Sequence, residues 1–411
     1  MTKHIEIMAP AGSWESLTAG LKAGADAVYF GIDKLNMRSG TRNNFTVDDL
    51  PAITSYCREY GAKSCLTLNT VLFDEDLEQM RSLVDAASAA GVTALIVSDP
   101  AVMQHARETG MNVHISTQCN ITNAWTVRFY AQWADVMVLA RELNLDQVAA
   151  ITREIRDQNI TGPSGRQVRV EVFIHGALCM AVSGKCYLSL HSHNSSANRG
   201  SCVQNCRRPY EVRDKQSGME LEIDNEYIMS ASDLCTIGFL DKVVGAGVEV
   251  MKIEGRGRSA DYVQTVVTCY REALSAIQEG TYTREKVAEW EKRLSAVYNR
   301  GFWEGYYLGR TMGEWSDTYG SKATVRKIYL AKCENYYQKV NAGVFLVETG
   351  TLSEGDEIMI TGPTTGVIRV KAGELRVDDT TVARVRKGDL FTTAVPEKVR
   401  RADKLYKLVP S

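Results

Sequence analysis

The feature that most constrains the fold is a unit that recurs along residues 1–260, in which a helical pattern ends at glycine and a short apolar run follows. Five copies read KAGADAVYFG, EYGAKSCLTL, AAGVTALIVS, ETGMNVHIST and GAGVEVMKIE. Glycine just after a helix adopts the left-handed conformation that ends it. A β-branched run of this length is typical of a buried parallel strand. The repeat therefore predicts an α/β fold in which helices and parallel strands alternate.

Three further apolar runs raise the number of predicted strands to eight. They read IEIMAPAG at the start of the chain, DVMVLAREL near residue 135 and VRVEVFIHG near residue 170. Eight βα units favour a TIM-type (β/α)8 barrel over residues 1–322, with an open doubly wound sheet as the alternative. No glycine-rich phosphate-binding loop follows the first strand, which argues against a Rossmann fold.

After residue 322 the pattern changes to short alternating strands with Gly and Asp turns, which predicts a small all-β barrel domain over residues 323–411. The phrase VETGTLSEGDEIMITGP resembles the small β-barrels appended to many RNA-handling proteins. This part carries 15 Lys and Arg against 11 Asp and Glu, whereas residues 1–322 carry 33 against 39. A solvated charged rim would explain any one of its cations, but as a set they could contact RNA phosphates. They are Arg326, Lys327, Lys332, Arg400, Arg401 and Lys404.

Polar side chains directly follow several predicted strands, and a (β/α)8 barrel carries its active site at the C-terminal ends of its strands. Any one of these side chains could cap a helix or close a turn. Together they outline a pocket suited to an anion. They are Tyr29, Asn69, Ser116, Gln118, Arg141, His175, Glu254 and Arg256.

Four of the ten cysteines fall within the 36 residues 171–206, which begin in the VRVEVFIHG strand and would cap the same face. Thiolates are soft ligands that select iron–sulfur clusters or zinc. Only the last two cysteines have the close spacing of a structural zinc site, so the wide gaps favour a larger iron–sulfur cubane. A mixed Cys/His zinc site stays open, because three histidines are nearby. The four cysteines are Cys179, Cys186, Cys202 and Cys206.

The composition is that of a soluble globular protein, with 44% hydrophobic and 24% charged residues. No apolar stretch is long enough to span a membrane, so we expect no membrane partner. The chain begins MTKHIEIMAPAG, without an apolar targeting segment. We therefore expect a cytoplasmic location with reduced thiols rather than disulfides.

The run EVFIHGALCMAVSGKCYLS, residues 171–189, resembles the signature of peptidase family U32, the collagenase-like peptidases. The resemblance covers essentially the whole chain and includes the phrases APAG, GADAVYFG, NRGSCVQNCR, MSASDLC and KIEGR. Within the family, the length and the C-terminal β domain are most similar to the tRNA hydroxylases that make 5-hydroxyuridine at the wobble position. Relatives hydroxylate a ribosomal RNA cytidine or, as heterodimers, a ubiquinone precursor.

This resemblance implies an enzyme that hydroxylates tRNA with prephenate, rather than O2, as the oxygen donor. It also implies an iron–sulfur cluster, of the 4Fe–4S type, on the four cysteines named above, with Cys235 as a fifth candidate ligand. Guanidinium groups bind the carboxylates of such a donor through paired hydrogen bonds. The predicted substrate-binding residues are Arg38, Asn69, Gln118, Arg141, Arg199 and Arg256. The predicted proton-transfer residues are Glu171, His175 and Glu254. The expected partners are tRNA and prephenate, and the oligomeric state is left open.

Three other functions remain open from the sequence. A collagenase-like protease of the same family would need a nucleophile such as Cys179 beside His175, although HExxH, GxSxG and papain-like motifs are absent from the sequence. A hydroxylase could instead act on ribosomal RNA or another aromatic substrate. A non-catalytic RNA-binding module with a structural metal would leave the polar barrel mouth unexplained.

Overall fold

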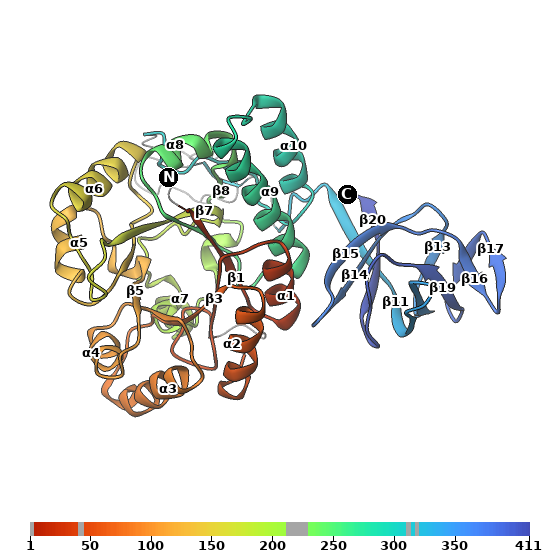
Figure 1. Cartoon of the computed structure of the whole chain (residues 1–411), viewed down its shortest axis with the longest axis horizontal. Helices are drawn as coiled ribbons and strands as arrows, with labels where there is room; N and C mark the ends of the chain where they lie inside the picture. Colours follow the sequence, from red (N-terminus) through yellow and green to blue (C-terminus); the bar gives the residue numbers. More distant parts are fainter. Residues whose placement is uncertain (1–3, 40–44, 211–228, 310–313, 317–319) are drawn as a thin grey trace.

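The eight predicted strands form a closed parallel barrel, which confirms the TIM-like fold class (Figure 1). The computed structural model describes residues 4–39, 45–210, 229–309, 314–316 and 320–411. The barrel strands are β1 (Glu6–Pro10), β2 (Ala27–Phe30), β3 (Lys63–Leu68), β4 (Ala94–Val97), β5 (Val113–Ile115), β6 (Val136–Val138), β7 (Arg169–Ala177) and β9 (Val250–Ile253). Strands β1 to β7 pair in parallel in chain order, and β9 closes the ring by pairing with both β1 and β7.

Helices cover the outside of the barrel and end where the glycine pattern predicts. Gly24, Gly61, Gly91, Gly110 and Gly247 each lie two residues beyond a helix and have φ between 68° and 90°, a conformation that glycine adopts without steric cost. The covering helices are α1 (Trp14–Lys22), α2 (Leu50–Glu59), α3 (Leu77–Ala89), α4 (Pro100–Glu108), α5 (Ala124–Tyr130), α6 (Leu145–Asp157), α8 (Leu240–Gly245), α9 (Ala260–Gln278) and α10 (Arg284–Ser295). In the part of the chain described here, none of the helices has the length and apolarity needed to cross a membrane.

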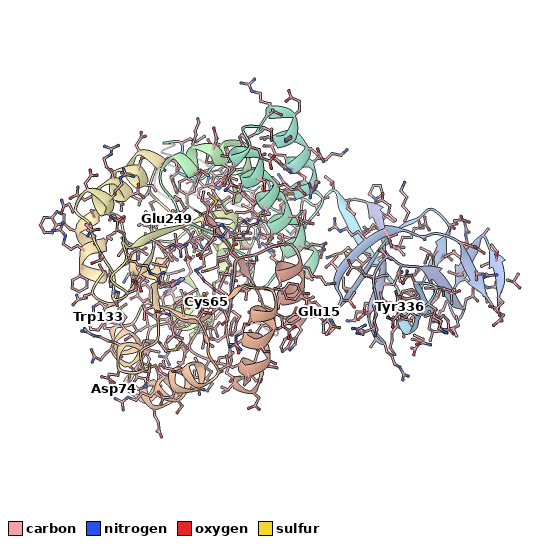
Figure 2. All side chains as sticks on the ribbon, in the orientation of Figure 1. Glu15, Cys65, Asp74, Trp133, Glu249 and Tyr336 are labelled. Carbon is pink, nitrogen blue, oxygen red and sulfur yellow. The ribbon has the colours of Figure 1, made fainter. Side chains whose placement is uncertain are left out.

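The inside of the barrel is filled in layers of different character. An apolar layer includes Met8, Tyr29, Cys65 and Ile96, and Figure 2 shows Cys65 among the strands in the middle of the barrel. Towards the N-terminal ends of the strands, Glu6 accepts a hydrogen bond from Lys63 (2.5 Å) and forms an ion pair with Arg169 (2.8 Å). The barrel is therefore a packed core rather than a pore, as this fold requires.

Two short strands extend the sheet beyond the predicted eight. Strand β8 (Asp233–Cys235) pairs antiparallel with the end of β7, and β10 (Phe302–Trp303) pairs in parallel with β8. The phrase SASDLC, which contains Cys235, is thus an added strand at the rim of the barrel. This addition decides which side chains at the end of β7 remain accessible.

Residues 323–411 form an all-β domain with its own apolar core, which includes Leu330, Phe345, Phe391 and Leu405. Eight strands make one antiparallel sheet in the order β15-β14-β20-β11-β12-β19-β16-β17, and β13 pairs with β18. The strands are β11 (Val325–Tyr337), β12 (Ala342–Val347), β13 (Thr351–Ser353), β14 (Glu357–Gly362), β15 (Gly366–Lys371), β16 (Leu375–Val377), β17 (Thr380–Val382), β18 (Arg384–Arg386), β19 (Leu390–Ala394) and β20 (Lys404–Pro410).

The β domain packs against the side of the barrel formed by α1 and α9, as Figures 1 and 2 show, with Glu15 of α1 beside the sheet. Ala19 and Ala260 contact Met359 and Val367 across this interface. Ion pairs to a buried carboxylate reinforce the contact, because Asp261 at the start of α9 accepts a hydrogen bond from Lys327 (2.5 Å) and lies 3.8 Å from Arg369. The domains are thus fixed by both apolar and charged contacts.

Candidate active site

A cavity of about 1030 Å³ lies at the C-terminal ends of the barrel strands, between the barrel mouth and the cysteine segment, residues 171–206. The strand ends of the barrel line its inner part, and residues 177–188 and 202–207 contribute to its outer part. Ten of the predicted cluster-binding, substrate-binding and proton-transfer residues line it. They are Arg38, Asn69, Gln118, Arg141, Cys179, Cys186, Cys202, Cys206, Glu254 and Arg256.

Gly176 lets the cysteine segment leave β7 next to Glu254. Its φ is 104°, and a Cβ at this position would collide with the backbone oxygen of Glu254 and approach the Tyr262 hydroxyl to 2.8 Å. The segment then passes through α7 (Leu188–His193), of which Leu188 and His191 line the cavity, and continues along the cavity to Cys202. Only glycine tolerates both the conformation and the close backbone approach.

All four cysteines line the cavity, although they are separated along this segment. Burial raises the pKa of Cys206, and nearby Cys179, Cys202 and Cys186 raise it further against the opposing effect of Arg207. Four soft thiols that line one cavity and interact electrostatically with one another suit the ligand set of an iron–sulfur cluster. Within the described ranges, no three His, Cys, Asp or Glu side chains stand at the spacing of a single-ion site.

Cys235 lies apart from these four thiols. It is not among the cavity-lining residues, and its sulfur is 3.9 Å from the Tyr270 hydroxyl. Burial raises its pKa to about 12, so the side chain is a neutral thiol packed at the pairing of β7 with β8. The structure thus groups Cys179, Cys186, Cys202 and Cys206 and leaves out the fifth candidate.

His175 does not reach the cavity, because β8 and the surrounding aromatic side chains enclose it. Its ring lies 5.5–5.9 Å from the rings of Tyr262, Tyr270 and Phe302. Burial lowers its pKa to about 3. Its Nε2 has no hydrogen-bond partner among the described residues, and its Nδ1 is 3.4 Å from the Tyr270 hydroxyl. No hydrogen bond joins His175 to Cys179, so a cysteine–histidine pair is not formed.

Glu254 is held at the barrel mouth by arginines from two other loops. Its Oε1 accepts a hydrogen bond from Arg38 at 3.1 Å, and its Oε2 is 3.9 Å from Arg141. Burial raises the pKa of Glu254, but Arg38, Arg141 and Arg256 outweigh it and hold that pKa below its usual value. Arg141 also lies over the Phe173 ring at 4.0 Å. The carboxylate is therefore ionised and fixed in position.

Arg256 is held separately, by oxygen atoms of the barrel mouth. It donates hydrogen bonds to Thr67 (2.7 Å) and Asn36 (3.1 Å) and lies within 5.8 Å of the Tyr29 ring. In the same cavity, the Asn69 amide donates to Ser116 (3.1 Å) and Gln118 (3.3 Å). Cationic and amide groups therefore both line the cavity.

Glu171 lies beneath the cavity rather than on its surface. It is fully buried, accepts a hydrogen bond from Lys252 at 2.7 Å and lies 3.6 Å from His114. Burial raises its pKa, but the charge of Lys252 and the neighbouring His114 outweigh this effect and lower it to about 2. Lys252 itself lines the cavity, 4.6 Å from the Tyr29 ring. Glu171 therefore acts on the cavity through Lys252.

Arg199 is a rim residue that ties the cysteine segment to the loop after β3. It binds Asp76 at 2.7 Å, donates to the backbone of Val71 and lies 3.9 Å from the Phe73 ring. It is not among the cavity-lining residues. In the β domain, Lys327 is engaged by Asp261, while Lys332 and Arg401 both pair with Glu334.

The cavity is more cationic than the sequence suggested, because eight Lys and Arg but a single carboxylate occur among its described lining residues. Lys252 could have been found from the alternation of inward positions in VEVMKIE, which places residues 250, 252 and 254 on one face. The others come from loops whose positions the sequence does not fix. The cations not predicted are Lys185, Arg207, Lys252, Arg258 and Arg300.

Comparisons with known proteins agree with one another on the family. The profile of Peptidase family U32 matches residues 12–317. A protein of Porphyromonas gingivalis named collagenase is 57% identical over 402 residues, which is 98% of this chain and 97% of that protein. A tRNA hydroxylation protein of Bacillus subtilis is 32% identical over 370 residues, 88% of this chain and 85% of that protein.

Two further likenesses cover less of this chain. A 23S rRNA 5-hydroxycytidine synthase of Escherichia coli is 36% identical over 277 residues, 67% of this chain but 40% of that protein. The solved structure of the U32 peptidase Mk0906 aligns with a TM-score of 0.41 at 14% identity, covering 62% of this chain and 94% of that one.

Proposed function

Because the chain belongs to peptidase family U32, we propose that it is an RNA-modifying enzyme that hydroxylates the wobble uridine of tRNA to 5-hydroxyuridine. The proposal includes prephenate as the oxygen donor, no use of O2, and an iron–sulfur cluster. The observation that carries it is the meeting of four cysteines, eight cations and one carboxylate in a single cavity. The relatives named for tRNA hydroxylation and for 5-hydroxycytidine synthesis in rRNA support it.

The four cavity cysteines would hold the cluster, and when bound it supplies a redox-active, Lewis-acidic centre. Thiolate ligands bring negative charge into the cavity, and Arg207, beside Cys206, offsets part of it. Arg207 is itself held by the backbone oxygens of Leu178 and Ala231 at 2.5 Å. This residue therefore serves the cysteine wall rather than the substrate.

The inner wall suits a small dianion such as prephenate. Arg38, Arg141 and Arg256 present guanidinium groups at the barrel mouth, and such groups bind carboxylates in paired, charge-assisted hydrogen bonds. Replacing a C–H bond by C–OH oxidises the base by two electrons, so the donor must lose an oxygen atom and take up the same two electrons. The arginines would fix the donor's orientation during this transfer.

The cavity can hold a base and a small co-substrate together. Its volume of about 1030 Å³ is at the upper end for pockets that enclose one drug-sized ligand. A base-modifying enzyme draws its target out of the stack and binds the polar edge of the base by hydrogen bonds. Asn69 and Gln118 on the inner wall are suited to that edge.

Proteolysis is the second candidate, because a relative that is 57% identical over nearly the whole chain is named collagenase. A cysteine peptidase needs a base within hydrogen-bond reach of its nucleophile. His175 is enclosed by aromatic rings and makes no hydrogen bond to Cys179. This arrangement favours hydroxylation over a peptidase that uses these two residues.

The deciding experiment is mass spectrometry of tRNA nucleosides from a strain in which the gene is deleted and restored. We expect 5-hydroxyuridine to disappear on deletion and to return with the wild-type gene but not with Cys202→Ala. The anaerobically purified protein should then restore the modification in vitro only when prephenate is added. Unchanged tRNA nucleosides, together with gelatin cleavage by cluster-free protein, would reject the proposal in favour of proteolysis.

A further inference from the structure

Glu254 is the single carboxylate among the described residues that line the cavity, and it occupies the arginines that an anionic ligand would need. Arg38 donates to it at 3.1 Å and Arg141 lies 3.9 Å away. Its side chain is only 16% exposed, so water screens these contacts weakly. A carboxylate in this position resembles a bound ligand more than a surface ion pair.

Two opposing effects act on this carboxylate. Burial alone raises its pKa, and only the three arginines bring the pKa below the usual value. An anion that binds Arg38 and Arg141 reduces their effect on Glu254, while the burial remains. A negative charge placed nearby also disfavours a second one. Anion binding therefore makes Glu254 more basic.

We propose that Glu254 is a catalytic residue. Its carboxylate binds Arg38 and Arg141 until an anionic co-substrate binds these two arginines instead. Glu254 then accepts the proton released by the reacting base. This inference rests on the proposed function for the identity of that base. The class of co-substrate is a small dicarboxylate. Proton acceptance by Glu254 is thereby coupled to occupation of the donor site.

The chemical step balances in atoms and electrons. The C5 carbon of the base attacks the hydroxyl oxygen of the donor, and a C5–OH bond forms. The donor's own C–O bond breaks, and its electron pair stays on the donor carbon, which takes up a proton from water. The C5–H bond then breaks, its electron pair returns to the ring, and the proton goes to Glu254. The donor is reduced by two electrons and the base is oxidised by two.

Neither the two tyrosines nor the further cations near Glu254 can take this role. Tyr29 on β2 and Tyr262 on α9 are buried, and burial raises their pKa well above the usual value, so both stay neutral. Tyr262 also donates its hydroxyl hydrogen to the backbone oxygen of Glu254. Arg256 faces the site as a cation, and Lys252, two residues earlier on β9, is paired with Glu171.

Calorimetric titration of the anaerobically purified full-length protein tests the proposal without relying on activity. Prephenate and phenylsuccinate are titrated separately in buffers of different ionisation enthalpy, which reports the protons taken up on binding. We expect uptake of a fraction of a proton by the wild type and none by Glu254→Gln. Because Glu254→Gln no longer competes for the arginines, it should bind the dicarboxylate more tightly, on the order of tenfold or about 1.4 kcal/mol.

Glu272→Gln is the matched control. Glu272 is a carboxylate on α9 that is clamped by Arg293 at 2.5 and 3.1 Å and does not line the cavity, so this change should leave proton uptake and affinity as in the wild type. Weaker binding by Glu254→Gln, or equal proton uptake in all three proteins, would overturn the proposal. Proton uptake with phenylsuccinate but no response to prephenate would support the role of Glu254 while rejecting prephenate as the donor.

Discussion

The ion pair between Lys252, which lines the cavity, and Glu171 beneath it allows a test of how much this pair contributes to the stability of the barrel. The pKa of Glu171 falls from its usual 4.5 to about 2. Each pKa unit corresponds to about 1.4 kcal/mol, so the folded state favours the charged carboxylate by roughly 3 kcal/mol. Lys252→Met would leave that charge buried without its main partner. We expect this substitution to lower the free energy of unfolding by about 3–5 kcal/mol at pH 7.

The sign of the pH dependence follows from the direction of the shift. Because the pKa of Glu171 is lower in the folded state, its contribution is complete above about pH 4.5 and is lost as the pH falls towards 2. The double variant Lys252→Met with Glu171→Gln removes the isolated charge. It should therefore be more stable than Lys252→Met alone.

Urea unfolding of Lys252→Met, Glu171→Gln, the double variant and Lys63→Met measures these effects. Lys63 also pairs with a barrel carboxylate, Glu6, but its side chain is 42% exposed and Glu6 keeps Arg169 as a second partner. Lys63→Met should therefore cost only about 1 kcal/mol or less. Equal losses for Lys63→Met and Lys252→Met, or additive losses in the double variant, would refute the reasoning.

Three further outcomes are expected. Alanine at any one of the four cavity cysteines should remove iron from the anaerobically purified protein, whereas Cys235→Ala and Cys333→Ala should retain it. Iron analysis and visible absorbance measure this, and retention of iron in any cavity variant would show that the ligand is misassigned. His175→Phe should flatten the loss of stability as the pH falls from about 6.5 towards 3, because His175 binds its proton only in the unfolded chain over that range; an unchanged acid unfolding curve would contradict its burial as a neutral ring. Asp261→Ala should make the link between the domains more sensitive to limited proteolysis, since it removes the partner of Lys327 and Arg369; a wild-type cleavage pattern would mean that the apolar contacts suffice.

The barrel could be predicted from local pattern because its causes are local. A glycine two residues beyond a helix needs only its own φ, and Gly24 or Gly91 shows this in the sequence. The inward face of β9 is likewise set by alternation, so Lys252 was within reach of prediction. The four cysteines could be singled out because soft ligands gathered in a polar loop, rather than dispersed in an apolar core, are typical of a metal or cluster site; that they hold a cluster stays a prediction.

The roles of individual charged residues depended on long-range contacts and could not be read in the same way. His175 stands at a strand end, where an accessible group is expected, but β8 arrives from 58 residues later and encloses it. Arg199 has the chemistry of an anion ligand, but Asp76 and Phe73 engage it. Lys327 meets Asp261 across a domain boundary that no local pattern records.

If the chain acts on RNA as proposed, the docking of the β domain on α9 has a consequence for the size of that RNA. Asp261, which anchors the β domain, is seven residues from Glu254 at the cavity. The span from the sheet to the barrel mouth is therefore set by one short, well-packed stretch of chain. If RNA contacts both domains, this stretch sets the distance between the RNA contacts on the β domain and the cavity. An RNA whose stem is too short or too long would then place its unpaired base outside the cavity, whatever the base itself.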